Sequence, residues 1–148
     1  MKLREYKPTD CKQLAELFYQ TIHHVNAKDY SAEQLAVWAS GSVDLRKWDQ
    51  SFREHHTVVA VENGKIVGFG DMTPCGYLDR LFVHKDYQSR GIATAICREL
   101  EQRATGKTIT VRASVTAKSF FEHRGYHIVR KENVFRNGIF LPAYQMEK

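Results

Sequence analysis

The residues with the clearest chemical potential form one continuous segment, Gln88-Ser89-Arg90-Gly91-Ile92-Ala93-Thr94, which follows an apolar stretch ending at Val83. Helical spacing begins near Gly91, so this segment is expected to be a loop that opens into a helix. The first turn of a helix has backbone N–H groups without internal partners and a partial positive charge, which together suit a phosphate group. Gly91 and Ala93 let an anion approach the backbone, and Arg90 adds positive charge. Taken alone, the same residues also fit an ordinary helix start that binds nothing.

Other residue types that often do chemistry lack the spacing that the chemistry needs. The adjacent pairs His23-His24 and His55-His56 point in different directions on a helix or strand, so neither pair can chelate one ion in the usual way. The sequence has no His-Glu-x-x-His motif, no paired-cysteine motif and no Gly-x-Ser-x-Gly elbow. We therefore expect neither a metal site nor a hydrolase triad. The widely spaced Cys11, Cys75 and Cys97 are expected to be reduced thiols.

Length and composition are those of one folded domain, residues 1–148. Hydrophobic residues make up 43% of the chain and charged residues 26%, a balance that argues against disorder. No stretch approaches the ~20 apolar residues of a membrane span, and the first residues lack the apolar core of a signal peptide, so we expect a cytoplasmic protein. The 22 lysines and arginines behind the net charge of +5 are scattered. A local anion site is therefore favoured over nucleic-acid binding, and no membrane partner is expected.

The loop must be positioned by strands and helices, and the residue pattern indicates where these lie. β-rich or alternating residues predict strands at Lys2–Tyr6, Thr57–Val61, Lys65–Met72, Tyr77–Val83, Ile109–Ala113, Tyr126–Phe135 and Ile139–Met146. Helical spacing predicts helices at Asp10–Asn26, Ser31–Trp38, Val43–Phe52, Gly91–Ala104 and Val115–Arg124. Asn63-Gly64 and Asn137-Gly138 predict hairpin turns. This order gives a mixed sheet with helices on both faces, an α/β (α+β) sandwich.

Three segments together resemble the GNAT superfamily of N-acetyltransferases. The pattern Gln88-x-x-Gly91-x-Ala93, after an apolar strand ending in Leu81-x-Val83, is similar to the acyl-CoA signature of that superfamily. A second stretch is similar to its second cofactor region, in which a helix ends at Gly-Phe or Gly-Tyr: Ser114-x-x-Ala117-x-x-Phe120-Phe121-x-x-x-Gly125-Tyr126. The opening strand and helix also resemble the superfamily's start, from Leu3-Arg4 through Asp10 to Leu14 and Leu17. The resemblance covers nearly the whole chain.

The resemblance implies a fold and a cofactor. The fold is the acyl-CoA N-acyltransferase fold, a single domain whose mostly antiparallel sheet splays open between strands 77–83 and 109–113. The pantetheine arm of acetyl-CoA would lie in that gap, and its pyrophosphate on the N–H groups of the loop. The cofactor-binding residues implied are Leu81, Phe82, Val83, Gln88, Ser89, Arg90, Gly91, Ile92, Ala93, Thr94, Ser114, Lys118 and Phe120. For Lys118 and Phe120, a solvated lysine and a core aromatic remain equal alternatives.

The resemblance also implies transfer of an acetyl group to a primary amine of a small molecule or peptide, directly within a ternary complex. Asp79 is the leading candidate for the base and Tyr77 the second, although Asp79 is equally suited to pair with Arg80. Relatives often carry an acid Tyr four residues before the helix-ending glycine, where this chain has Phe121, which has no proton to give. That difference leaves a non-catalytic CoA-binding or interaction module as the alternative function.

The acceptor would bind between the first strand and the first hairpin. Substrate-binding residues expected there are His24 and Tyr30, beside Trp38 and Trp48, of which at least one tryptophan is expected in the core. An acidic lining from Asp79 and Asp71 would favour cationic amines such as polyamines, aminoglycosides or lysine side chains. The C-terminal hairpin, which contains Pro142, is a possible edge for a homodimer.

Overall fold

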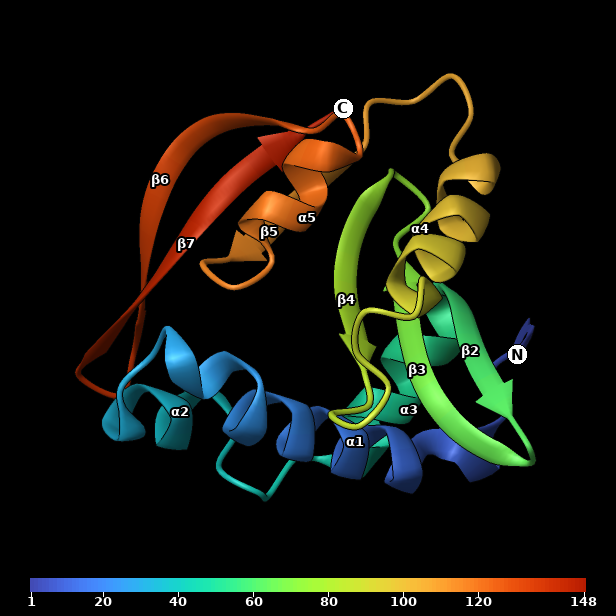
Figure 1. Ribbon diagram of the computed structural model, residues 1–148, viewed down its shortest axis with the longest axis horizontal. Helices are drawn as coiled ribbons and strands as arrows, with labels where there is room; N and C mark the ends of the chain where they lie inside the picture. The colour runs from blue at the N-terminus through green and yellow to red at the C-terminus, as the bar shows by residue number, and fades with distance from the viewer.

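Seven strands form one sheet in the computed structural model, which describes residues 1–148 (Figure 1). The strands, in sheet order, are β1 (Lys2–Glu5), β2 (His56–Glu62), β3 (Lys65–Met72), β4 (Tyr77–Val83), β5 (Thr110–Ser114), β7 (Ile139–Glu147) and β6 (His127–Arg136). The helices are α1 (Cys11–His24), α2 (Ala32–Trp38), α3 (Leu45–Glu54), α4 (Ile92–Arg103) and α5 (Lys118–His123). Every neighbouring pair is antiparallel except β4 and β5. The predicted fold class is confirmed.

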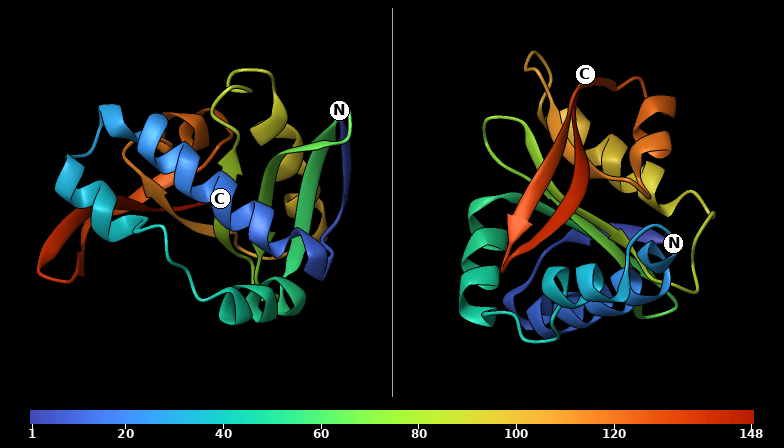
Figure 2. Two further views of the ribbon diagram at one scale, coloured as in Figure 1. Left: turned by 90° about the horizontal axis from the view of Figure 1, so that it is seen from below. Right: turned by 90° about the vertical axis from the view of Figure 1, so that its left-hand side faces the viewer.

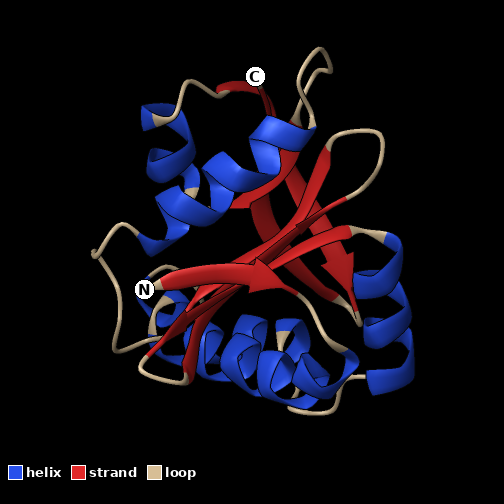
Figure 3. Ribbon diagram, turned by 90° about the vertical axis from the view of Figure 1, so that its right-hand side faces the viewer, coloured by secondary structure: helices blue, strands red, loops and turns tan.

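Helices cover both faces of the sheet, as Figure 3 shows. Alternate residues of β2 serve the two faces: Val58 is buried in the core under α4 with Ile96, whereas Val59 is buried in the core under α1 with Leu14. A strand places successive side chains on opposite faces, so this apolar run contributes side chains to the cores on both faces of the sheet. At the other end of the sheet, the β6–β7 hairpin extends toward α2 (Figure 2). No helix has both the length and the hydropathy needed to cross a membrane.

The predicted hairpin turns form as the Asn-Gly pairs require. Asn63 and Gly64 have φ of 51° and 76°, and Asn137 and Gly138 have φ of 48° and 82°. Both turns thus have two successive residues of positive φ, which suits the twist of the strands they join. The helix expected at 115–124 begins three residues later, at Lys118, since the chain first makes a turn.

The sheet opens between β4 and β5. These strands pair only through Tyr77 with Thr110 and Leu78 with Val111, and then diverge, as Figure 1 shows. On its other side β4 stays paired with β3, but its register shifts at Asp79, which has no partner there. An extra residue of this kind is a β-bulge, and a bulge bends and twists its strand. The predicted splay is confirmed.

Candidate active site

Two cavities lie at the opening between β4 and β5. The loop cavity, of about 310 Å³, lies against the loop before α4 and is lined among others by Thr21, Tyr87, Gln88, Ser89, Gly91, Ile92, Ala93, Thr94 and Phe120. The hairpin cavity, of about 370 Å³, lies toward α3 and the β6–β7 hairpin and is lined among others by Phe18, Tyr30, Trp38, Trp48, Tyr77, Asp79, Arg80, Phe121 and Arg136. Four residues line both cavities: Leu81, Phe82, Ser114 and Ala117. An elongated ligand in one cavity can therefore reach the other.

The loop before α4 is shaped to receive an anion. Gly91 is the N-cap of α4 with φ of 80°, and no atom lies within 4 Å of the place where a Cβ would stand. The N–H groups of Ile92, Ala93 and Thr94 have no hydrogen-bond acceptor within the protein. Free N–H groups at a helix N-terminus, beside open space, are the arrangement that binds phosphate. The residues present thus fit the pyrophosphate of a CoA molecule.

The side chain of Gln88 holds this loop to the end of β4. Its amide Nε2 donates to the carbonyl oxygens of Val83 at 2.8 Å and His84 at 3.3 Å. The hydroxyl of Thr21, from α1, donates to the same Val83 oxygen at 2.9 Å. The signature glutamine is therefore a structural brace through its side chain. The Val83 carbonyl already accepts two bonds and is not free for a pantetheine amide, whereas Val83 itself does line the loop cavity, as expected of a cofactor residue.

The backbone of β4 presents a free edge to the opening. The carbonyls of Arg80 and Phe82 face β3, where they lie 3.1 and 3.2 Å from the positions that a Cβ of Gly70 or Gly68 would occupy. Because successive residues of a strand direct their hydrogen-bonding groups to opposite sides, Leu81 directs its N–H and C=O toward the opening. This edge can pair with the amides of a pantetheine arm and can donate to a carbonyl oxygen.

Two predicted cofactor residues point elsewhere. The Arg90 guanidinium lies 3.5 Å from a carboxylate oxygen of Glu62 and stacks on the Tyr87 ring, and Arg90 lines neither cavity. The Lys118 ammonium lies 3.6 Å from Glu122, one turn further along α5, and also lines neither cavity. Both cations have surface partners, so the loop would hold its anion chiefly through backbone groups.

Ser114 and Phe120 do line the loop cavity, as expected. The Ser114 hydroxyl oxygen accepts a bond from the Ala117 N–H at 3.1 Å, which makes the turn that delays α5. The Phe120 ring meets the Phe121 ring edge to face, with centroids 5.2 Å apart. Phe121 is 2% exposed and also packs against Tyr126, so it belongs to the core while bordering the hairpin cavity.

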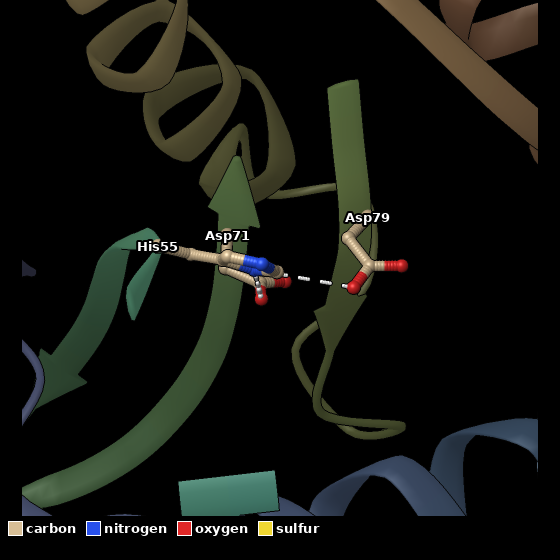
Figure 4. A group of neighbouring side chains, drawn as sticks. All are labelled: His55, Asp71 and Asp79. Atoms are coloured by element: carbon tan, nitrogen blue, oxygen red, sulfur yellow. Dashed lines mark hydrogen bonds and ion pairs between the residues drawn. The ribbon is translucent and has the colours of Figure 1, made fainter. Parts of the chain in front are cut away.

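Asp79 lies beside a buried group of charges formed by Asp71, Arg80 and His55, and Figure 4 draws Asp79 with Asp71 and His55. The Asp71 side chain is fully buried and accepts bonds from Arg80 Nε at 3.1 Å, Arg80 Nη2 at 2.7 Å and His55 Nδ1 at 2.8 Å. Asp79 Oδ2 lies 3.4 Å from Arg80 Nη2 and 4.0 Å from His55 Nδ1. The Asp79 side chain is 36% exposed and lines the hairpin cavity, so one carboxylate is structural and the other is accessible.

These surroundings change the acidity of three groups. Burial, with the neighbouring negative charge of Asp71, raises the pKa of Asp79. The hydrogen bond to Asp71 raises the pKa of His55. Burial, with the charge of Asp79, raises the pKa of Tyr77, which keeps its proton. A carboxylate with a raised pKa at a cavity wall is a stronger base than an ordinary carboxylate, whereas Tyr77 is the weaker candidate.

The same three residues, His55, Asp71 and Asp79, have donor atoms within 4.8 Å of one another, a spacing compatible with a metal ion. The Arg80 guanidinium, however, donates to both carboxylate oxygens of Asp71. A metal cation would have to displace that guanidinium, so the donor set fits an organic cation better than a metal.

Of the two predicted substrate-binding residues, only Tyr30 lies at a cavity. Tyr30 borders the hairpin cavity, and its hydroxyl donates to the Pro142 carbonyl at 2.7 Å and accepts from the Val115 N–H at 2.9 Å. This hydroxyl joins β7 to the segment after β5. His24 lies exposed at the end of α1, with Nδ1 bonded to the Gln20 carbonyl oxygen at 2.8 Å, and lines neither cavity. His24 is therefore not placed to contact an acceptor, which corrects that expectation.

Sequence reasoning missed His55 and the arrangement around Arg80. The Arg80 guanidinium lies over the rings of Trp48 and Phe52, at 5.0 and 4.3 Å from their centroids, and so crosses from β4 to α3. One signal was present: Asp71 stands in an otherwise apolar strand, and a charge at such a position needs a buried partner. The identity of that partner depends on the approach of β3, β4 and α3.

Comparisons with known proteins agree with this geometry. The acetyltransferase (GNAT) domain family matches residues 26–148. The N-acetyltransferase YafP of Escherichia coli (strain K12) is 32% identical over 146 residues, which cover 99% of this chain and 94% of YafP. A GCN5-related N-acetyltransferase from Rhodopseudomonas palustris superposes with a TM-score of 0.94 at 35% identity, covering 99% of this chain and 94% of that one.

At greater distance, the PaiA N-acetyltransferase of Thermoplasma acidophilum, in complex with coenzyme A, shares the fold with a TM-score of 0.79 at 17% identity, covering 99% of this chain and 97% of that one. The open sheet and the loop at the start of α4 define an acyl-CoA N-acyltransferase fold. The chain belongs to the GNAT family of acetyl-CoA-dependent N-acetyltransferases.

Proposed function

We propose that this protein transfers an acetyl group from acetyl-CoA to a primary amine, directly within a ternary complex. The observation that supports this most is the pair of cavities that share Leu81, Phe82, Ser114 and Ala117 across the opening of the sheet. Acetyl-CoA would place its pyrophosphate at Gly91 and its pantetheine arm along β4. The thioester would then meet the acceptor in the hairpin cavity. The PaiA N-acetyltransferase, which shares the fold, is in complex with coenzyme A.

Asp79 is the proposed base. The amine nitrogen forms a bond to the thioester carbonyl carbon and gives its proton to the Asp79 carboxylate, and the C–S bond then breaks. The Leu81 N–H would donate to the carbonyl oxygen and stabilise it as negative charge develops there. The sulfur leaves as a thiolate, which is a tolerable leaving group because a free thiol has a pKa of about 8.5. No proton from the Phe121 position is needed.

A direct transfer is favoured over a two-step route through an acetylated cysteine. Cys11 and Cys97 are buried in the core, and Cys75, the one exposed cysteine, lies in the turn before β4. None of the three lines either cavity. A cysteine thiolate that received the acetyl group would need to reach the thioester, and none is placed to do so.

The hairpin cavity favours an amine with an apolar body over a polycation. Its one acidic residue is Asp79, whereas Arg80, Arg112 and Arg136 all line it. The acidic lining expected from the sequence is therefore wrong, because Asp71 is buried behind the wall. Arg112 pairs with Glu132 at 3.0 Å, and Glu132 also pairs with Arg130, whereas Arg136 has no carboxylate within salt-bridge distance. An amine that carries an anionic group at its far end would match both Asp79 and Arg136.

The test measures release of CoA thiol from acetyl-CoA with a panel of primary amines. At least one apolar amine should be acetylated, and Asp79→Asn should lower kcat by 10²-fold or more, within the usual range for a general base, while acetyl-CoA affinity stays the same. Asp86→Asn, in the exposed loop after β4, is the matched control and should keep full activity. Tight acetyl-CoA binding without acetylation of any amine would instead favour the non-catalytic CoA-binding module.

A further inference from the structure

His55 stands between two carboxylates that belong to different strands. It is the last residue before β2, at the C-terminal end of α3, and its side chain is 15% exposed. Its Nδ1 bonds to Asp71 Oδ2 at 2.8 Å and lies 4.0 Å from Asp79 Oδ2. Figure 4 shows the ring directed at both groups. His55 lines neither cavity, so it acts on the site only through its neighbours.

We propose that His55, fixed by Asp71, is a positioning residue whose positive charge keeps Asp79 ionised and ready to accept the amine proton. The inference rests on the proposed role of Asp79 as the base. His55 itself belongs neither to the loop before α4 nor to the walls of the two cavities.

The effect of His55 on the protonation of Asp79 depends on the other charged side chains around these two residues. Asp71 comes from β3, Asp79 and Arg80 from β4, and His55 from the end of α3, where Ser51 adds a neutral hydroxyl bonded to Arg80. With His55 protonated, two cations balance two carboxylates. With His55 neutral, the group has a net negative charge. Because Asp71 is held by both nitrogens of the Arg80 fork, Asp79 is the carboxylate that would then bind a proton.

The other groups around Asp79 do not change their charge together with His55. Tyr77 keeps its proton, and across the hairpin cavity Glu132 pairs with both Arg112 and Arg130, each at 3.0 Å. Arg80 lies nearer to Asp79 than His55 does, at 3.4 Å against 4.0 Å, and its charge also lowers the pKa of Asp79, but two hydrogen bonds hold it to Asp71 and its charge cannot be removed without unpairing that buried carboxylate. The charge of His55 is therefore the one that can be removed without unpairing the buried Asp71.

His55→Asn is the variant that isolates the charge. Its amide nitrogen can stand near the position of Nδ1 and donate to Asp71, but it carries no charge. Loss of a cation 4.0 Å away should raise the pKa of Asp79, by about one to three units for an effective dielectric constant between that of water and ~20. The acid limb of the plot of kcat/KM against pH should move to higher pH by that amount. The plateau value of kcat/KM and the affinity for acetyl-CoA should stay close to those of the wild type. His56→Asn, one residue along the chain, is the matched control and should leave the limb in place.

A second measurement does not need activity. Coupling between two ionisable groups is mutual, so Asp79→Asn should lower the pKa of His55, followed by NMR of its ring protons, by the same amount of about one to three units. A His55 pKa that is equal in wild type and Asp79→Asn overturns the inference, even if no acceptor amine is ever found. An acid limb that stays unchanged in an active His55→Asn enzyme also overturns it, and leaves the acetyltransferase function standing.

Discussion

The anion site at the start of α4 gives the sharpest prediction about acetyl-CoA. Gly91→Ala and Gly91→Glu both place a side chain at a residue with φ of 80°, where no atom lies within 4 Å of the added Cβ. With no clash, the cost in folding free energy is that of a left-handed L-residue, about 1–2 kcal/mol. For a chain of this size, that lowers Tm by about 2–8 °C. Both variants should therefore fold.

Binding should respond far more strongly than stability. A glutamate near a diphosphate brings like charges to within about 4 Å, and at an effective dielectric constant of ~20 each such pair costs ~4 kcal/mol. Gly91→Glu should weaken acetyl-CoA binding by more than about 100-fold, since ~2.7 kcal/mol already gives that factor. Gly91→Ala, which only fills part of the space, should cost about tenfold.

Calorimetric titration with acetyl-CoA and thermal unfolding of the free protein together check this reasoning. Gly106→Glu is the matched control, because Gly106 also has a positive φ, of 85°, and open space at its Cβ, but lies in the loop after α4. The control should lose similar stability and keep its affinity. Acetyl-CoA binding by Gly91→Glu within about threefold of wild type would place the anion elsewhere and refute the reasoning.

Three further changes test the surrounding structure. Tyr30→Phe removes the hydroxyl that bonds both Pro142 and Val115, and should cost about 1–3 kcal/mol of unfolding free energy in urea titrations. Phe121→Tyr should fold, since its ring borders the hairpin cavity, and should leave turnover equal or higher with unchanged acetyl-CoA affinity. With ω-aminocarboxylates of increasing length compared with the matching alkylamines, Arg136→Gln should abolish a carboxylate advantage of about tenfold in kcat/KM. An advantage that persists in that variant would show that Arg136 does not bind the acceptor.

Most of the fold could be predicted because local signals and the sheet agree. The strands at 65–72 and 77–83 have the predicted bounds, and the Asn-Gly turns fix the two hairpins. The loop at Gly91 could be found because its requirement is local: a positive φ followed by free N–H groups. The ion pairs of Arg90 with Glu62 and of Lys118 with Glu122 could not be predicted, because they depend on which surface carboxylates the fold brings near, and Lys118 takes the alternative of a solvated lysine.

The surroundings of the base could not be predicted, because a β-bulge changes the alternation of β4. Strict alternation would put Leu78 on the opposite face from Leu81 and Val83, yet all three pack into the core under α4. The extra residue, Asp79, shifts the register at the point where β4 leaves β5, and this shift puts the three apolar side chains on the same face. The bulge thus opens the sheet for the cofactor and puts a carboxylate at the opening, beside Arg80. The same inserted residue thus marks the point where the sheet opens and carries the carboxylate that we propose as the base.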